Sequence, residues 1–124
     1  MSVQYIPDGQ SAIAPYFLTK DAEGLIAFLK AAFGAKERHR TLGPESLIRH
    51  AEIAIDGAIV FVGARVHTTE NSTHLYVPDV DATYTLALLH GATSISEPQT
   101  FSYGDRSAGI RDPHGNTWWL GTHQ

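Results

Sequence analysis

A histidine and a glutamate two positions apart, His50 and Glu52, are the residues whose types and spacing best fit acid–base chemistry. They lie in an alternating segment, residues 47–55, that predicts a β-strand. Successive side chains of a strand point to opposite faces, so these two project from one face and the apolar set from the other. We expect His50 and Glu52 to face a cavity as candidate catalytic residues, because histidine titrates near neutral pH and a neighbouring carboxylate supports it as a base. The alternatives are a solvated sheet face and a structural pair. The apolar set consists of Ala51, Ile53 and Ile55.

A third charged candidate, Arg106, is placed by comparing two turns. Aligning Asp56 with Asp112 makes Arg106 the counterpart of His50. We therefore expect the Arg106 guanidinium to face the same cavity, where paired hydrogen bonds would anchor a carboxylate or a phosphate. The alternative is a salt bridge to Glu52 across the sheet.

The composition excludes several other classes of function. The chain has 124 residues, 9 basic and 13 acidic, with a formal net charge of −4, so it offers no basic stripe for nucleic acid. It has no cysteine, which excludes disulfides, thiolate catalysis and zinc–thiolate sites and fits a reducing compartment. No apolar run approaches the roughly 18 residues of a membrane span, and residues 1–10 carry no apolar signal core. We expect a cytoplasmic protein with neither nucleic acid nor membrane as a partner.

The elements that must position these residues occur twice in the same order: one strand, one helix and three strands. An offset of 60 pairs Tyr16 with Tyr76, and an offset of 58 pairs Gly63 with Gly121. The sequence therefore predicts one α+β domain over residues 1–124, made of two β-α-β-β-β modules that form a cupped, mixed, mostly antiparallel sheet. The modules span about residues 11–65 and 72–123. Expected strands cover residues 11–19, 36–41, 47–55, 58–62, 73–77, 93–96, 105–111 and 116–120, expected helices cover 21–33 and 79–90, and a loop with Pro98 covers 97–103.

Four segments of the chain carry a resemblance to a known family. They are residues 28–35, 50–53, 103–106 and, most specific, the Asp-Pro-His-Gly-Asn turn with its strand over residues 112–119. Together they resemble the vicinal oxygen chelate superfamily, which includes glyoxalase I, bleomycin-resistance proteins and extradiol dioxygenases, and within it the PhnB-like branch. The resemblance covers nearly the whole chain. It implies a glyoxalase-like fold and a homodimer.

Metal-dependent members of that superfamily hold a divalent ion with His and Glu side chains from the first and fourth strands of each module. Mapped onto this chain, the four positions are Ala14, Phe61, His74 and Trp119. Alanine and phenylalanine have no donor atom, and an indole N–H has no lone pair to give. We therefore expect no metal cofactor of the usual kind. A divalent metal held in a non-standard site by His74 with His50 and Glu52 is the less favoured alternative.

The large residues at these positions favour an organic ligand instead. Phe61 and Trp119 would present an apolar, stacking surface at the centre of the cavity, or else only pack the core. The expected ligand-binding residues are Phe61, His74, Arg106, Trp119 and Tyr103.

Three functions follow from these features, and fold alone does not decide among them. The favoured one is a metal-free protein of the glyoxalase/bleomycin-resistance type that binds a small organic molecule. The second is an enzyme with lyase, isomerase or dioxygenase-like chemistry at a non-standard metal or acid–base site. The third is a structural or regulatory dimer without a small ligand.

Overall fold

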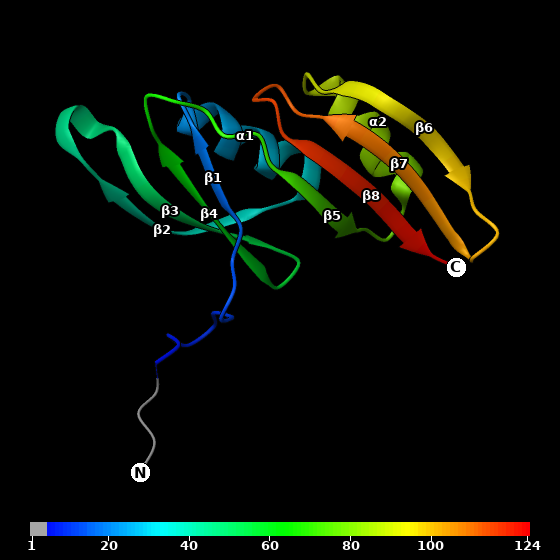
Figure 1. Ribbon diagram of the computed structural model, residues 1–124, viewed down its shortest axis with the longest axis horizontal. Helices are drawn as coiled ribbons and strands as arrows, with labels where there is room; N and C mark the ends of the chain where they lie inside the picture. The colour runs from blue at the N-terminus through cyan, green and yellow to red at the C-terminus, as the bar shows by residue number, and fades with distance from the viewer. Residues whose placement is uncertain (1–4) are drawn as a thin grey trace, which may run out of the picture.

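The computed structural model describes residues 5–124, which form two four-stranded sheets with one helix each (Figure 1). The first module contains β1 (Tyr16–Thr19), α1 (Ala22–Phe33), β2 (Lys36–Leu42), the short 3₁₀ helix η1 (Pro44–Ser46), β3 (Ile48–Ile55) and β4 (Ala58–Ala64). The second contains β5 (Ser72–Tyr76), α2 (Val80–Leu89), β6 (Thr93–Thr100), β7 (Asp105–Arg111) and β8 (Thr117–His123). The predicted α+β fold with two β-α-β-β-β modules is confirmed.

Both sheets have the same topology, with the first strand of the module beside the fourth. The strand orders are β1-β4-β3-β2 and β5-β8-β7-β6. In each sheet the first and fourth strands run parallel, and the other neighbours are antiparallel. Because a parallel pair needs a crossover, the helix and the two intervening strands of each module supply the connection. The shared topology is the structural counterpart of the sequence offsets.

Short polar side chains and a glycine set the limits of the helices. The carboxylate of Asp21 accepts a hydrogen bond from the Gly24 N–H at 2.9 Å, and α1 ends at Gly34 in the left-handed conformation, with φ of 67°. Asp79 caps α2 by accepting from the Ala82 N–H at 3.2 Å. Neither helix of the described chain has the length and apolarity of a membrane span.

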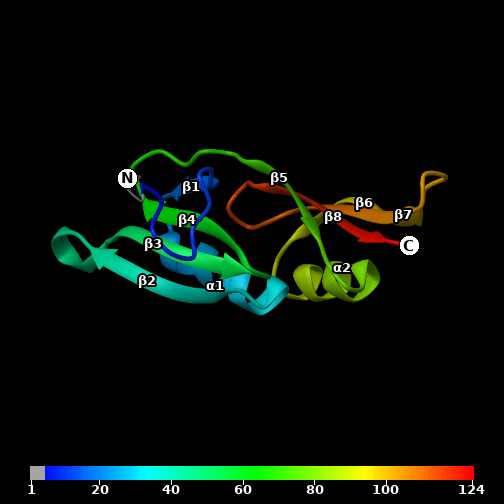
Figure 2. The same ribbon diagram turned by 90° about the horizontal axis from the view of Figure 1, so that it is seen from below.

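One apolar core lies between the helices and the inner faces of both sheets. Figure 2 shows α1 and α2 on the same side of the two sheets. The modules meet where Trp118 of β8 stacks on Phe17 of β1, with ring centroids 5.3 Å apart and planes within 7° of parallel. Phe33 of α1 packs edge-on against the same indole at 4.9 Å. Each sheet therefore has a helix-covered inner face and an opposite face, called here its open face.

β1 and β6 differ most from their expected limits, and β4 and β8 run two and three residues further than expected, to Ala64 and His123. β1 begins at Tyr16, several residues after the expected start. β6 runs on to Thr100, through Pro98, where a loop was expected. Proline has no N–H to donate, but β6 is an edge strand and its pairing with β7 is irregular between Ser96 and Gln99. The proline therefore costs the sheet no regular ladder bond.

Candidate functional site

Three rings cluster on the open face of the first sheet. Tyr16 lies opposite Phe61 in the pairing of β1 with β4, and their ring centroids are 5.5 Å apart. The His50 ring, from β3, lies 4.6 Å from the Phe61 ring, and His50 Nδ1 shares a hydrogen bond of 2.8 Å with the Tyr16 hydroxyl. A phenol, and not a carboxylate, therefore orients the His50 imidazole.

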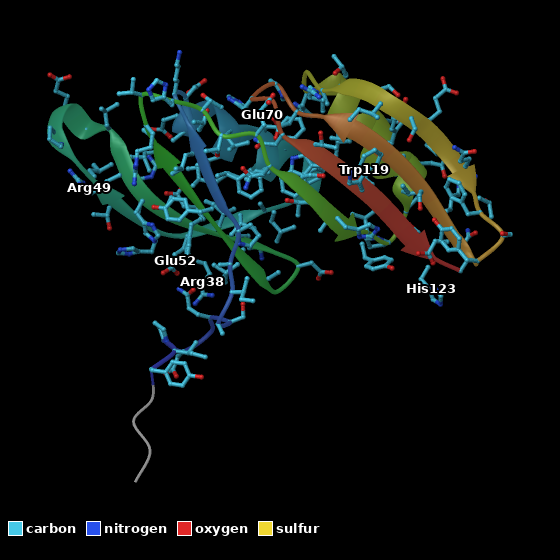
Figure 3. The ribbon with its side chains drawn as sticks, in the orientation of Figure 1. Arg38, Arg49, Glu52, Glu70, Trp119 and His123 are labelled. Carbon is cyan, nitrogen blue, oxygen red and sulfur yellow. The ribbon has the colours of Figure 1, made fainter. Side chains whose placement is uncertain are left out.

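Glu52 lies on the same open face as His50, as the alternation predicted, but its carboxylate is bound by the N-terminal segment, here residues 5–12. Gln10 Nε2 donates to Glu52 Oε1 at 2.6 Å, and Arg38 donates to the Gly9 carbonyl at 3.2 Å. Figure 3 shows Glu52 and Arg38 close to this segment. Within residues 5–124, no hydrogen bond joins His50 to Glu52. The two candidate catalytic residues share a face without forming an acid–base pair.

On the open face of the second sheet, two rings lie directly over two glycines. A Cβ added to Gly109 would come within 2.6 Å of Trp119 Cζ3, and one added to Gly121 would lie 3.2 Å from the His74 ring. The Trp119 indole is held in this position by Nε1, which donates to Ser72 Oγ at 3.1 Å. Because the glycines have no side chains, the two rings can lie low on the sheet and leave space above it.

That space is a cavity of about 230 Å³ over β7 and β8, called here the second-sheet hollow. Phe101 and Tyr103, from the end of β6 and the following loop, stack with centroids 5.4 Å apart and planes within 11° of parallel. Three of the predicted ligand-binding residues, His74, Tyr103 and Trp119, line this one cavity. Phe61 lies on the other sheet. The hollow is lined mainly by His74, Phe101, Tyr103, Asp105, Ser107 and Trp119.

Asp105 contributes a carboxylate to the hollow that the sequence had not singled out. Its Oδ2 accepts from the Tyr76 hydroxyl at 3.3 Å, and its Oδ1 accepts from His123 Nδ1 at 2.8 Å. The negative charge of Asp105 raises the pKa of Tyr76, because it opposes formation of a phenolate beside it. The signal was available in the sequence, because Asp105 lies beside Tyr103 in one of the segments that resemble the family.

Arg106 does not face the hollow, so the prediction that its guanidinium points into the cavity is wrong. Its guanidinium binds both carboxylate oxygens of Asp81 on α2, at 2.6 and 2.9 Å, which lowers the pKa of Asp81. The expected alternative partner, Glu52, is in the other module. Arg106 therefore joins α2 to the inner face of its own sheet.

The pairing of the strands explains this error. Glu52 lies opposite Phe61, and Gly109 lies opposite Trp119, so Glu52 corresponds to Gly109. Aligning the turn aspartates matches Glu52 with Ala108 instead, because the β7–β8 turn is longer than the β3–β4 turn. A shift of one residue moves every side chain of a strand to the other face.

The same pairing corrects the first of the four family positions. His74 lies opposite Trp119, and Tyr16 lies opposite Phe61, so Tyr16 and not Ala14 corresponds to His74. These four positions hold one imidazole, one phenol and two groups without a free lone pair, which is not a donor set for a divalent ion. Across the part of the chain that the structure describes, no three His, Asp or Glu side chains are grouped as metal ligands are. The residues present do not fit the metal of the family.

The family itself follows from sequence similarity over most of the chain. The model of the Glyoxalase/Bleomycin resistance protein/Dioxygenase superfamily matches residues 13–120. The chain belongs to this superfamily. Its relatives include the uncharacterized protein Rv0887c of Mycobacterium tuberculosis, which is 33% identical over 126 residues that cover 90% of this chain and 74% of that protein.

Solved structures of the superfamily share the fold. TioX from Micromonospora sp. ML1 superposes with a TM-score of 0.79 at 24% identity, over 92% of this chain and 99% of that one. A PhnB protein from Bacillus cereus, described as a putative 3-demethylubiquinone-9 3-methyltransferase, superposes with a TM-score of 0.69 at 12% identity, over 90% and 99% of the two chains. At these identities the similarity shows the fold alone.

Proposed function

We propose that this superfamily member is a metal-free protein that binds a small organic molecule in the second-sheet hollow. The contrast between two adjacent tryptophans carries the proposal. Trp118 is 1% exposed in the core, whereas Trp119 is 41% exposed on the open face, lying over Gly109. A ring that only packed the core would be covered, so Trp119 is suited to stack on a ligand.

The positions that hold a metal in other members support the same function. Phe61 and Trp119 replace metal ligands with ring surface on both open faces. An organic molecule with a flat or apolar part would gain contact with such surfaces, whereas an ion would gain none. The enzymatic alternative receives no support from the described contacts, because His50 is bound to Tyr16 and Glu52 to Gln10.

The second-sheet hollow suits a ligand better than the cavity beside Phe61 on the first sheet. A cavity of about 360 Å³ lies on the first sheet beside Phe61 and Glu52, but residues of the N-terminal segment form one of its walls. A ligand there would compete with the hydrogen bond from Gln10 to Glu52. Within residues 5–124, no residue of the N-terminal segment lines the second-sheet hollow.

A second copy of the chain is part of this proposal. Both open faces leave aromatic side chains exposed, including Tyr16, Tyr76 and Trp119. A homodimer that brought open faces together would cover these rings and close the cavities over their ligands. Sedimentation analysis measures this directly, and a monomer at all concentrations would contradict it. The cytoplasmic location stays a prediction, to be checked by cell fractionation.

A thermal-shift screen of small aromatic molecules tests the proposed function. A compound that binds in the second-sheet hollow should raise the Tm of the wild type and of Phe61→Ala, but not that of Trp119→Ala. The Phe61→Ala variant is the matched control, because it removes a ring at the corresponding position of the first sheet. A shift that survives in Trp119→Ala would contradict the assignment of the hollow. Stoichiometric nickel, zinc or iron in protein purified without chelator would contradict metal-free binding.

A further inference from the structure

We infer that the second-sheet hollow selects a flat, positively charged aromatic ligand, of the class of arylamidines and protonated aromatic amines. The inference rests on the proposed function, because it names the ligand class for the same cavity. The ligand charge inferred here is opposite to the negative charge that the sequence suggested. Arg106 would have anchored an anion, but the register of β7 turns Arg106 toward Asp81 and turns Asp105 into the hollow.

The carboxylate of Asp105 is fixed and still able to accept further hydrogen bonds. Asp105 is 9% exposed, and the Tyr76 hydroxyl and His123 Nδ1 each bind one of its oxygens. An ionised carboxylate has about four acceptor positions, so about two stay available to a ligand. A positioned carboxylate with free lone pairs matches the paired N–H groups of an amidinium or the N–H of an aromatic ammonium.

No lysine or arginine is among the described residues that line the hollow, and the described basic partner of the Asp105 carboxylate is the His123 imidazole. The neighbouring Arg106 is bound to Asp81 on the inner face, and Arg111 pairs with Glu70 at 3.5 Å. The whole chain also carries a formal net charge of −4. A partly buried carboxylate in such surroundings attracts a cation and repels an anion.

The walls of the hollow add a preference for a flat ring. Phe101 and Tyr103 present a parallel pair of rings, and Trp119 presents its indole on the sheet below. Figure 3 shows Trp119 and His123 on the same strand, β8. One rigid element therefore carries both the stacking indole and the imidazole that binds the Asp105 carboxylate. A planar cation gains both stacking and cation–π attraction from such rings. The volume of about 230 Å³ suits a small ring system.

Three probes of nearly the same shape and different charge test the inference: benzamidine, benzamide and benzoate. Calorimetric titration of the wild type near neutral pH should show benzamidinium binding about tenfold or more tighter than benzamide, as expected for a charge-assisted hydrogen bond, with benzoate the weakest. Asp105→Asn keeps the size and one acceptor but removes the charge, so it should abolish most of this advantage. Glu97→Gln removes one negative charge from an exposed position of β6 in the same module without breaking a described ion pair, and it should leave the preference unchanged.

Each outcome distinguishes the inference from the proposed function. Equal affinity for the three probes, or tightest binding of benzoate, overturns the inference and leaves small-molecule binding in place. An equal loss in Glu97→Gln and Asp105→Asn also overturns it, because net charge would then explain the preference. Binding of none of the three probes would contradict a ring-binding hollow and both proposals. The wild type alone gives a further test, since raised salt should weaken benzamidinium and not benzamide, and a salt-independent affinity for benzamidinium overturns the inference.

Discussion

The buried carboxylate of Asp112 holds the β7–β8 turn together, and its removal is predicted to destabilise the whole protein. Asp112 is 3% exposed. Its Oδ1 accepts from the backbone N–H groups of His114 at 2.8 Å and Asn116 at 3.1 Å, and its Oδ2 accepts from Trp118 Nε1 at 2.9 Å. One side chain thus fixes both the turn and the tryptophan that joins the two modules.

The magnitude follows from the donors that Asp112→Ala would leave without a partner. Three of these donors, the Asn116 N–H, Asn116 Nδ2 and Trp118 Nε1, belong to residues that are about 1% exposed, so water would not replace the carboxylate. An unsatisfied buried donor costs about 1–3 kcal/mol, so the three donors cost about 6 kcal/mol in total. The free energy of unfolding of a domain is about 5–15 kcal/mol, so the substitution would remove a large part of it. The loss would reach the first module, because the Trp118 ring stacks on Phe17.

Urea unfolding followed by far-UV circular dichroism measures this change. The control is Asp56→Asn, in the shorter turn of the first module, where the aspartate is exposed and has a φ of 46° that asparagine tolerates. The control should change the free energy of unfolding by less than about 0.5 kcal/mol. A loss below about 1 kcal/mol in Asp112→Ala, or an equal loss in Asp56→Asn, would refute the reasoning.

Three further changes test other parts of the structure. Gly109→Ala should push the Trp119 ring off the sheet, because the new Cβ would lie 2.6 Å from Trp119 Cζ3. The free energy of unfolding should fall by about 1–3 kcal/mol. An unchanged near-UV circular dichroism spectrum would contradict the described ring position. Gly34→Ala should destabilise by about 1 kcal/mol in thermal unfolding, solely because of its left-handed φ of 67°, since nothing lies within 4 Å of the added Cβ. The hydrogen bond from Arg40 lowers the pKa of Glu37. This pair therefore stabilises the fold fully above the ordinary glutamate pKa of about 4.3. Its contribution is lost as the pH falls through the lower pKa of the folded state. Glu37→Gln should therefore lose less than about 1 kcal/mol at neutral pH and flatten the acid limb of the stability profile; an acid limb that is unchanged in Glu37→Gln would assign that dependence to other groups.

Signals that are local in the chain were sufficient to predict the modules. Asp21 and Gly34 bound the first helix because capping depends on a few neighbouring residues. The alternation around His50 and Glu52 placed both on one face because the period of a strand is two residues. The repeated order of elements then implied the duplicated fold, which both sheets show.

Local patterns in the sequence were thus enough for the two modules, the limits of the first helix and the shared face of His50 and Glu52. The folded structure was needed to show that Asp105, and not Arg106, faces the hollow, and that Tyr16 is the partner of His50. These features depend on which residues pair across strands that are far apart in the chain. A turn of a different length shifts that pairing by one residue, and one residue is enough to exchange a cation for a carboxylate at the site.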